Sequence, residues 1–68
     1  MEIQEKVRLI RNMKGWSQKK LSERSGVNVN TIMNFENGKV SSSIDTVIYI
    51  LNAMGYTLNI VKLEGRND

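Results

Sequence analysis

Residues 17–38 constrain the fold more than any other stretch, because a glycine interrupts a run of residues that otherwise suits short helices. The stretch reads SQKKLSERSGVNVNTIMNFENG. Gly26 can adopt the positive φ that an abrupt change of direction needs. Asn37-Gly38 is a strong signal for the end of a helix. The pattern therefore predicts a helix over about 17–24, a turn at 25–27 and a second helix over about 28–37.

Two short helices joined in this way have the layout of a helix-turn-helix motif, which places its second helix in the DNA major groove. Ile32 and Phe35 mark the buried face of that helix. The opposite face is rich in asparagine and poor in charge, which helix propensity does not explain. Asparagine can bond bidentately to adenine, and apolar groups can contact a thymine methyl. The base-edge candidates are Val29, Asn30, Met33 and Asn34. The alternative is a plain amphipathic helix with an indifferent surface.

Polar and basic residues that flank the second helix are candidates for phosphate contact. Ser17 is the expected N-cap of the first helix, and the two lysines that follow oppose the helix dipole. A phosphate near this helix end would account for them, whereas the alternative is a solvated basic face. Lys39 and the serines after it would lie beside the second helix. The candidates are Ser17, Lys19, Lys20, Asn37, Lys39 and Ser41.

The remainder of the chain predicts two further helices and one strand. Apolar spacing indicates helices over about 2–13 and 44–54, and the apolar residues of the latter cover more than one face, so part of that surface needs a second cover. Residues 56–63 alternate like a strand. A lone strand needs a partner, and a second copy of the chain would provide one around a two-fold axis. That interface would contain Tyr56, Leu58, Ile60 and Val61. A fifth helix is the alternative, weakened by the β-branched content.

Length and composition limit the function classes that the chain can serve. Sixty-eight residues make one small domain, 1–68, with residues 64–68 expected to be a frayed tail. Cysteine and histidine are absent, so disulfides and the usual zinc sites are excluded, and neither metal nor cofactor is expected. An enzyme is disfavoured, because carboxylates paired at a useful spacing and a glycine-rich phosphate loop are missing too. The net charge of +3 suggests a polyanionic partner.

The sequence also gives an expectation about location. It contains no apolar run of about 18 residues, so no membrane span is expected. The first residues, MEIQEK, lack the apolar core of a secretion signal. We therefore expect a cytoplasmic protein that does not contact membranes. The predicted fold class is all-α, a four-helix helix-turn-helix domain with one C-terminal strand that pairs across a homodimer.

Residues 7–54 resemble the lambdoid-repressor (Cro/C1, or XRE) helix-turn-helix family. The residues that carry the resemblance are VRLIR, Trp16-Ser17-Gln18, Leu21, Gly26-Val27, Thr31-Ile32 and Phe35-Glu36-Asn37-Gly38-Lys39. Within the family, the motifs KGWSQ, NFEN and TLNIV are most similar to those of the HipB antitoxins. The resemblance implies a homodimer joined by a small intersubunit sheet, repression of the protein's own operon and a partner toxin of the HipA kinase type. Phage repressors of the family usually continue into a fifth helix instead.

The family's functional positions can be transferred to matching residues of this chain. The resemblance implies that Gln18 contacts backbone phosphate and braces the recognition helix. It adds Asn28 to the DNA-facing positions, and it implies a buried ion pair between Arg11 and Glu36. Val29 and Met33 depart from the long polar or small residues that are common at their positions. We therefore expect contacts to thymine methyls and adenine more than to guanine.

Two classes of function remain open at this point. The first is a dimeric repressor whose recognition helices enter successive major grooves about 34 Å apart on an inverted-repeat operator. The second is a protein-binding regulator whose main partner is a toxin kinase, which rests on the resemblance alone. A stand-alone phage-type or XRE-family repressor with no toxin partner is the alternative to an antitoxin.

Overall fold

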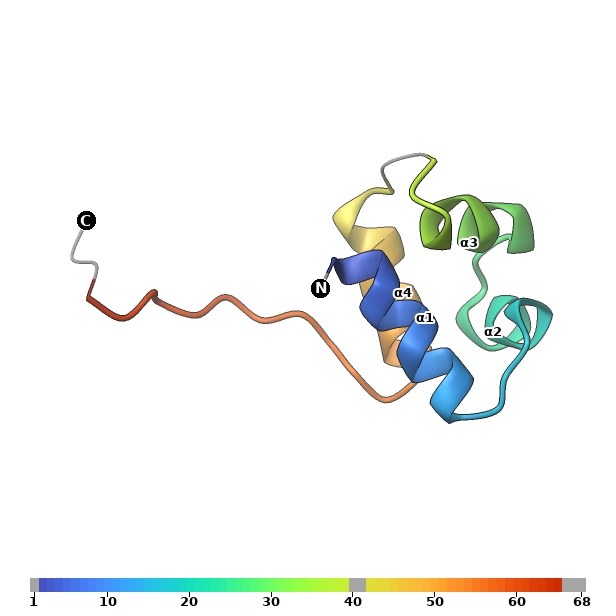
Figure 1. The fold of residues 1–68 in the computed structure, drawn as a ribbon, viewed down its shortest axis with the longest axis horizontal. Helices are drawn as coiled ribbons and strands as arrows, with labels where there is room; N and C mark the ends of the chain where they lie inside the picture. Colours follow the sequence, from blue (N-terminus) through green and yellow to red (C-terminus); the bar gives the residue numbers. More distant parts are fainter. Residues whose placement is uncertain (1, 40–41, 66–68) are drawn as a thin grey trace.

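The computed structural model describes residues 2–39 and 42–65, which form four α-helices followed by an extended C-terminal segment (Figure 1). The helices are α1 (Ile3–Met13), α2 (Gln18–Ser25), α3 (Val29–Glu36) and α4 (Ile44–Ala53). The all-helical, four-helix architecture expected from the sequence is present, and each helix begins and ends within one residue of its expected range.

Short polar side chains begin three of these helices. The Ser17 hydroxyl accepts a hydrogen bond from the backbone N–H of Lys20 at 3.0 Å, and Ser43 accepts from Thr46 at 3.2 Å. The side-chain oxygen of Asn28 accepts from the backbone N–H of Asn30 at 2.8 Å. Each bond satisfies a donor that has no acceptor inside its own helix. The starts of α2, α3 and α4 are therefore fixed locally.

A glycine in the left-handed conformation ends both α1 and α3. After α1 and after α3, Gly15 and Gly38 each have a φ of 70°, a left-handed conformation that costs glycine little. The following residue then reaches back into the helix: Trp16 N–H donates to the Arg11 carbonyl at 3.1 Å, and Lys39 N–H donates to Asn34 at 3.0 Å. This is the Schellman pattern, which satisfies the last carbonyls and turns the chain sharply.

All four helices contribute to one core. Its buried apolar residues are Val7, Leu21, Ile32, Phe35, Val47, Ile50, Leu51 and Met54. α2 packs against both α3 and α4, and α1 packs against α3. Trp16 and Val27, on either side of α2, pack against the edge of this core. The buried face of α3 therefore fixes which of its faces points outward.

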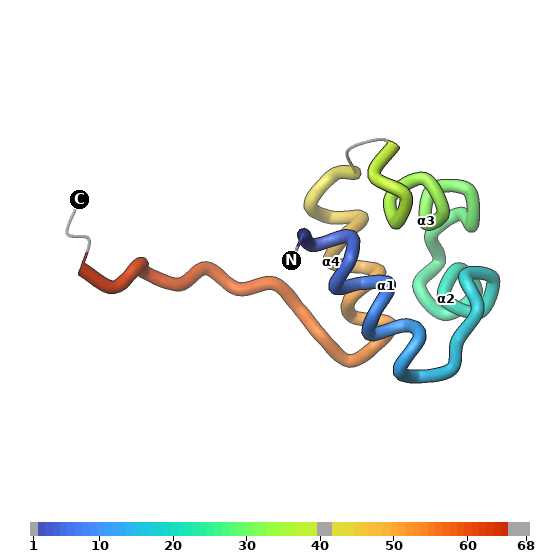
Figure 2. The backbone as a smooth tube through the Cα atoms, in the orientation of Figure 1, coloured from blue at the N-terminus to red at the C-terminus, as the bar shows by residue number. Residues whose placement is uncertain are grey.

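The C-terminal segment corrects one prediction. After Gly55 the chain leaves the helical domain and runs away from it (Figure 2). The strand predicted over 56–63 is not present in the described residues, and neither is the alternative fifth helix. A strand needs a neighbouring strand to complete its hydrogen bonds, and residues 2–39 and 42–65 of one chain offer none. The residues predicted to form the dimer interface are exposed in this segment. The accessible fractions are 49% for Tyr56, 37% for Leu58, 97% for Ile60 and 72% for Val61.

Candidate nucleic-acid interface

Helix α3 has two contrasting faces. Ile32 and Phe35 are 0% and 5% exposed, whereas Val29 and Met33 are 38% and 40% exposed. Asn28 and Asn30 are exposed, and Asn34 is half-buried. Residues four apart on a helix are neighbours on its surface, so Val29 with Met33 and Asn30 with Asn34 form two adjacent stripes. The outward surface of α3 thus presents an apolar stripe beside an amide stripe.

Asn28 differs from the other base-contact candidates because it already has a structural role. Its side-chain oxygen accepts the N–H of Asn30 and caps α3. The amide nitrogen of Asn28 makes no hydrogen bond within the described residues and can donate to acceptor groups on the DNA. Asn30 and Asn34 have no side-chain hydrogen bond within the described residues and can offer both a donor and an acceptor.

The C-terminal end of α3 is fixed by a buried carboxylate. The Glu36 side chain is fully buried. Arg11 on α1 donates to both of its oxygens, from Nε to Oε2 and from Nη2 to Oε1, each at 2.8 Å. Gln18 at the start of α2 donates from Nε2 to Oε1 at 3.1 Å. Arg11 also donates from Nη1 to the Trp16 carbonyl at 2.8 Å. One carboxylate thus joins α1, α2 and α3.

The protonation of Glu36 reflects this competition between burial and bonding. Burial alone would raise the pKa of the carboxyl group, because it penalises the charged form. The hydrogen bonds from Arg11 and Gln18, with the charges of Arg11 and Arg8, outweigh burial and hold the pKa of Glu36 below its ordinary value. The pKa of Arg11 is raised, chiefly by its hydrogen bond to Glu36. The pair is therefore ionised, and it positions α3 from the inside of the domain.

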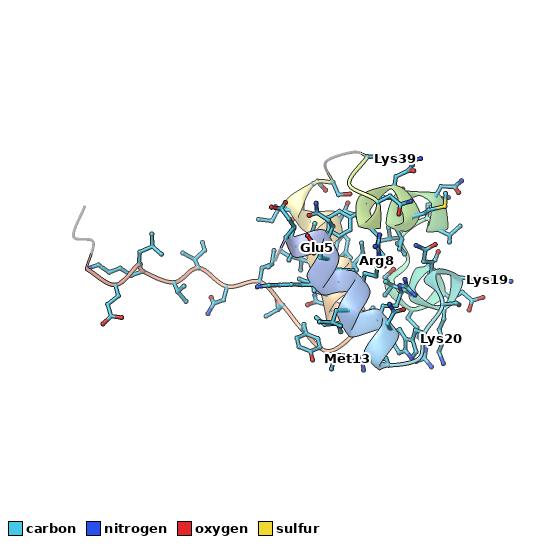
Figure 3. All side chains as sticks on the ribbon, viewed as in Figure 1. Glu5, Arg8, Met13, Lys19, Lys20 and Lys39 are labelled. Atoms are coloured by element: carbon cyan, nitrogen blue, oxygen red, sulfur yellow. The ribbon has the colours of Figure 1, made fainter. Side chains whose placement is uncertain are left out.

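The start of α2 presents backbone donors and positive charge together. The first hydrogen bond of the helix is donated by Leu21 to Ser17, so the N–H groups of Gln18 and Lys19 have no acceptor within the helix. Lys19 and Lys20 are exposed, and Figure 3 shows Lys19 projecting from α2 and Lys39 lying near the end of α3. Free N–H groups at a helix N-terminus, with cations beside them, suit a phosphate.

Lys20 also contacts an aromatic ring, which the sequence pattern did not indicate. Its Nζ lies 5.5 Å from the centroid of the Trp16 ring. Lys14 Nζ and the Arg24 guanidinium lie 5.2 Å and 5.7 Å from the same centroid. Cations over an indole face are attracted by the ring quadrupole. Two cations of α2, Lys20 and Arg24, are therefore already engaged with the Trp16 ring. Lys19 and Lys39 contact no ring or carboxylate within the described residues.

The remaining phosphate-contact candidates differ in whether their polar groups already make hydrogen bonds within the domain. The Ser17 hydroxyl oxygen is used as a helix cap. Gln18 uses one amide hydrogen on Glu36, which leaves the second one for a phosphate. Asn37 and Lys39 are exposed just after α3. Ser41 lies outside the described residues.

Sequence reasoning missed Arg8. Figure 3 labels Arg8 on α1. Its Nη2 donates to the backbone carbonyl of Glu36 at 2.6 Å and to Oδ1 of Asn37 at 3.2 Å, while its Nε lies 3.7 Å from Oε1 of Glu36. The only available signal was spacing, because Arg8 and Arg11 are three residues apart and so share one face of α1. An exposed arginine at such a position usually indicates a solvated face.

Other kinds of site find no support in the described part of the chain. Residues 2–39 and 42–65 contain no group of three acidic, histidine or cysteine side chains placed to hold a metal ion. Over the same residues, no helix is long and apolar enough to cross a membrane.

Comparisons with known proteins point to one family. A family model described as "Helix-turn-helix" matches residues 7–61. The curated antitoxin HipB of Escherichia coli O6:H1 is 32% identical over 54 residues, which cover 79% of this chain and 57% of the relative. Antitoxin HipB of Escherichia coli K12 is 30% identical over 54 residues, covering 79% of this chain and 61% of the relative. The chain thus matches little more than half of each curated relative.

A solved structure gives the same answer for the fold. It is described as a toxin-antitoxin module from Streptococcus pneumoniae, and it is similar to this chain with a TM-score of 0.78 and 46% sequence identity. The match covers 90% of this chain and 68% of the other. With the match of residues 7–61, these findings show that the chain belongs to the XRE-type helix-turn-helix family of DNA-binding proteins, in which antitoxins are among its relatives.

Proposed function

We propose that this chain is a sequence-specific transcriptional repressor that binds an inverted-repeat operator as a homodimer. The observation that carries the proposal is the exposed face of α3, which combines the apolar stripe Val29–Met33 with the amide pair Asn30 and Asn34. These groups match the thymine methyl and the adenine edge that the major groove displays. The opposite face of α3 is buried, and its end is fixed by Glu36, so the helix is presented rigidly.

Phosphate contacts on both sides of α3 would set its register in the groove. On one side are the free N–H groups at the start of α2 and the Lys19 ammonium. On the other side are Asn37 and Lys39, just after the end of α3. Phosphate contacts orient a protein on the duplex, whereas base contacts give it specificity. This arrangement supports α3 as the helix that reads the bases.

The homodimer in this proposal is supported by the surfaces that one chain leaves uncovered. Tyr56, Leu58 and Ile60 alternate along an extended segment, and none of them is buried. On α4, Ile44 and Tyr49 are 66% and 58% exposed. Pairing of the C-terminal segments around a two-fold axis would complete their backbone hydrogen bonds and cover apolar surface. It would also place two recognition helices on one operator.

We further propose that the chain is the antitoxin of the operon that it represses, with a HipA-type kinase toxin as its partner. Support comes from the names of its relatives, two HipB antitoxins and a toxin-antitoxin module. Co-expression with the neighbouring gene product tests this directly. A stable complex that neutralises a toxic kinase is the expected result, and a neighbour that is neither toxic nor bound would leave a stand-alone repressor.

DNA binding is tested by fluorescence anisotropy with DNA from upstream of the gene and a scrambled duplex of the same composition. We expect saturable binding to the upstream DNA with two chains per operator, and much weaker binding to the scrambled duplex. The titration is repeated at two salt concentrations, because non-specific attraction to phosphate fades steeply with salt. Equal, salt-sensitive binding to both duplexes would contradict the repressor.

A further inference from the structure

Arg8 connects the body of the domain to Asn37, the first residue after α3. Its Nη2 donates both to the Glu36 carbonyl and to Oδ1 of Asn37. Arg8 keeps 44% of its side chain exposed, in contrast with 11% for Arg11. The two arginines of α1 therefore differ in kind: Arg11 belongs to the interior of the domain, whereas Arg8 lies at its surface beside the proposed DNA interface.

The chemistry of this contact fixes the orientation of the Asn37 amide. A guanidinium has five donors and no acceptor, so only the oxygen of an amide can face it. The NH2 group of Asn37 must then point away from Arg8, toward the exposed side of the residue. Without Arg8, the amide would be free to rotate and to present its oxygen, which a phosphate repels.

We propose that Arg8 is a positioning residue for DNA binding, which acts by holding the Asn37 amide with its NH2 group turned outward to donate to a backbone phosphate. This inference rests on the proposed DNA-binding function and adds a residue to it. Arg8 acts through Asn37 and makes no contact with DNA itself. Its bond to the Glu36 carbonyl holds the same turn in place from the backbone side.

The proposal predicts that the effects of Arg8 and Asn37 on DNA affinity are coupled. The probe is a duplex of about 30 base pairs that the wild-type protein selects from a randomised library, long enough for two half-sites one helical turn apart. Asn37→Ala removes the proposed hydrogen bond from the Asn37 amide to a DNA phosphate, which should weaken binding about tenfold. Arg8→Gln should weaken it about fivefold, and by less than about twofold when Asn37 is already alanine, because residues that act as a unit are non-additive.

Two further variants separate positioning from charge. Asn37→Asp still accepts from Arg8 but has no proton to donate, so it should bind at least as weakly as Asn37→Ala. Lys6→Gln removes the same charge from an exposed position of α1 and should leave affinity unchanged. Thermal unfolding followed by circular dichroism checks that each variant is folded at the assay temperature.

Each outcome decides between distinct possibilities. An Arg8→Gln loss that is the same with and without Asn37, with a salt slope smaller by about one, would make Arg8 a direct phosphate contact and overturn the positioning role. Wild-type affinity in Asn37→Asp would overturn it as well. If the wild-type protein selects no sequence at all, the proposed repressor function fails first, and this inference fails with it.

Discussion

The helical domain and the C-terminal segment differ in how far their backbone N–H and carbonyl groups are hydrogen-bonded within one chain. In the domain, Ser17, Asn28 and Ser43 cap helix starts, and backbone bonds such as that from Lys39 to Asn34 close helix ends. Beyond Tyr56, whose N–H still bonds to Leu51, the described part of the segment makes no backbone–backbone hydrogen bond. The same segment exposes most of its apolar side chains. The domain thus fixes its helix starts and ends with its own residues, whereas the segment has the properties of an element that requires a partner.

The largest effect should come from the carboxylate that joins three helices of the domain. Glu36→Ala leaves the largely buried Arg11 guanidinium without its carboxylate partner. Removing one partner of a buried ion pair costs roughly 3–5 kcal/mol. We expect much or all of the stability of this small domain to be lost. Urea unfolding monitored by circular dichroism measures it.

The matched control is Glu23→Ala, which removes a carboxylate of the same type from an exposed position on α2. We expect a change within about 0.5 kcal/mol there. Equal, small losses in both variants would mean that the network around Glu36 does not hold the domain together.

Truncation after Gly55 tests the other side of the comparison. Because the core lies within Val7–Met54, the shortened protein should still unfold cooperatively. It should sediment as a monomer and lose roughly 100-fold or more in operator affinity, about 2.7 kcal/mol, since each half-site would then be bound alone. Analytical ultracentrifugation and the anisotropy titration measure the two quantities. A truncated protein that is still a dimer would show that another surface, such as exposed α4, makes the interface.

Asn30→Ala tests whether the exposed face of α3 reads bases. Loss of a bidentate contact should cost about 1–3 kcal/mol on the selected operator and relax the preference at one position of each half-site. Selection from a randomised library measures both changes. Because Asn30 is exposed, stability should be unaffected. Unaltered sequence preference would remove Asn30 from the reading surface.

Acid should weaken the domain through Glu36 in a defined direction. The pKa of Glu36 is lowered in the folded state, so its contribution to the free energy of unfolding is complete above its unfolded pKa, near the ordinary value of 4.5, and is lost as pH falls through the folded pKa. The difference in stability between wild type and Glu36→Gln should therefore shrink below that range. Urea unfolding of both proteins from pH 7 to pH 3 measures it, and a difference that stays constant would contradict an ionised pair.

The features that sequence reasoning predicted correctly are those that local chemistry determines. Helix caps, glycines and apolar spacing act within a few residues of the chain, and these local signals predicted the four helices. The strand at 56–63 was predicted from local propensity too, but a strand requires a ladder, and the partner is not in the described part of the chain. Arg8 was missed because its contacts with Glu36 and Asn37 join residues 28 and 29 positions apart. The partnership of Lys20 with Trp16 likewise depends on how α2 turns its side chains, which spacing alone does not reveal.

The smallest expected effect separates phosphate binding from base reading. Lys39 is exposed just after α3 and pairs with no carboxylate within the described residues. Lys39→Gln should weaken binding to all sequences alike and lower the slope of log affinity against log salt by about one, because one phosphate is no longer neutralised. Sequence preference should stay as it is, in contrast with Asn30→Ala. Titrations at four salt concentrations measure the slope. A Lys39 variant that changes the selected sequence while leaving the slope unchanged would show that Lys39 contacts bases in the groove and not the phosphate backbone. Base reading would then extend beyond α3 to the residues that follow it.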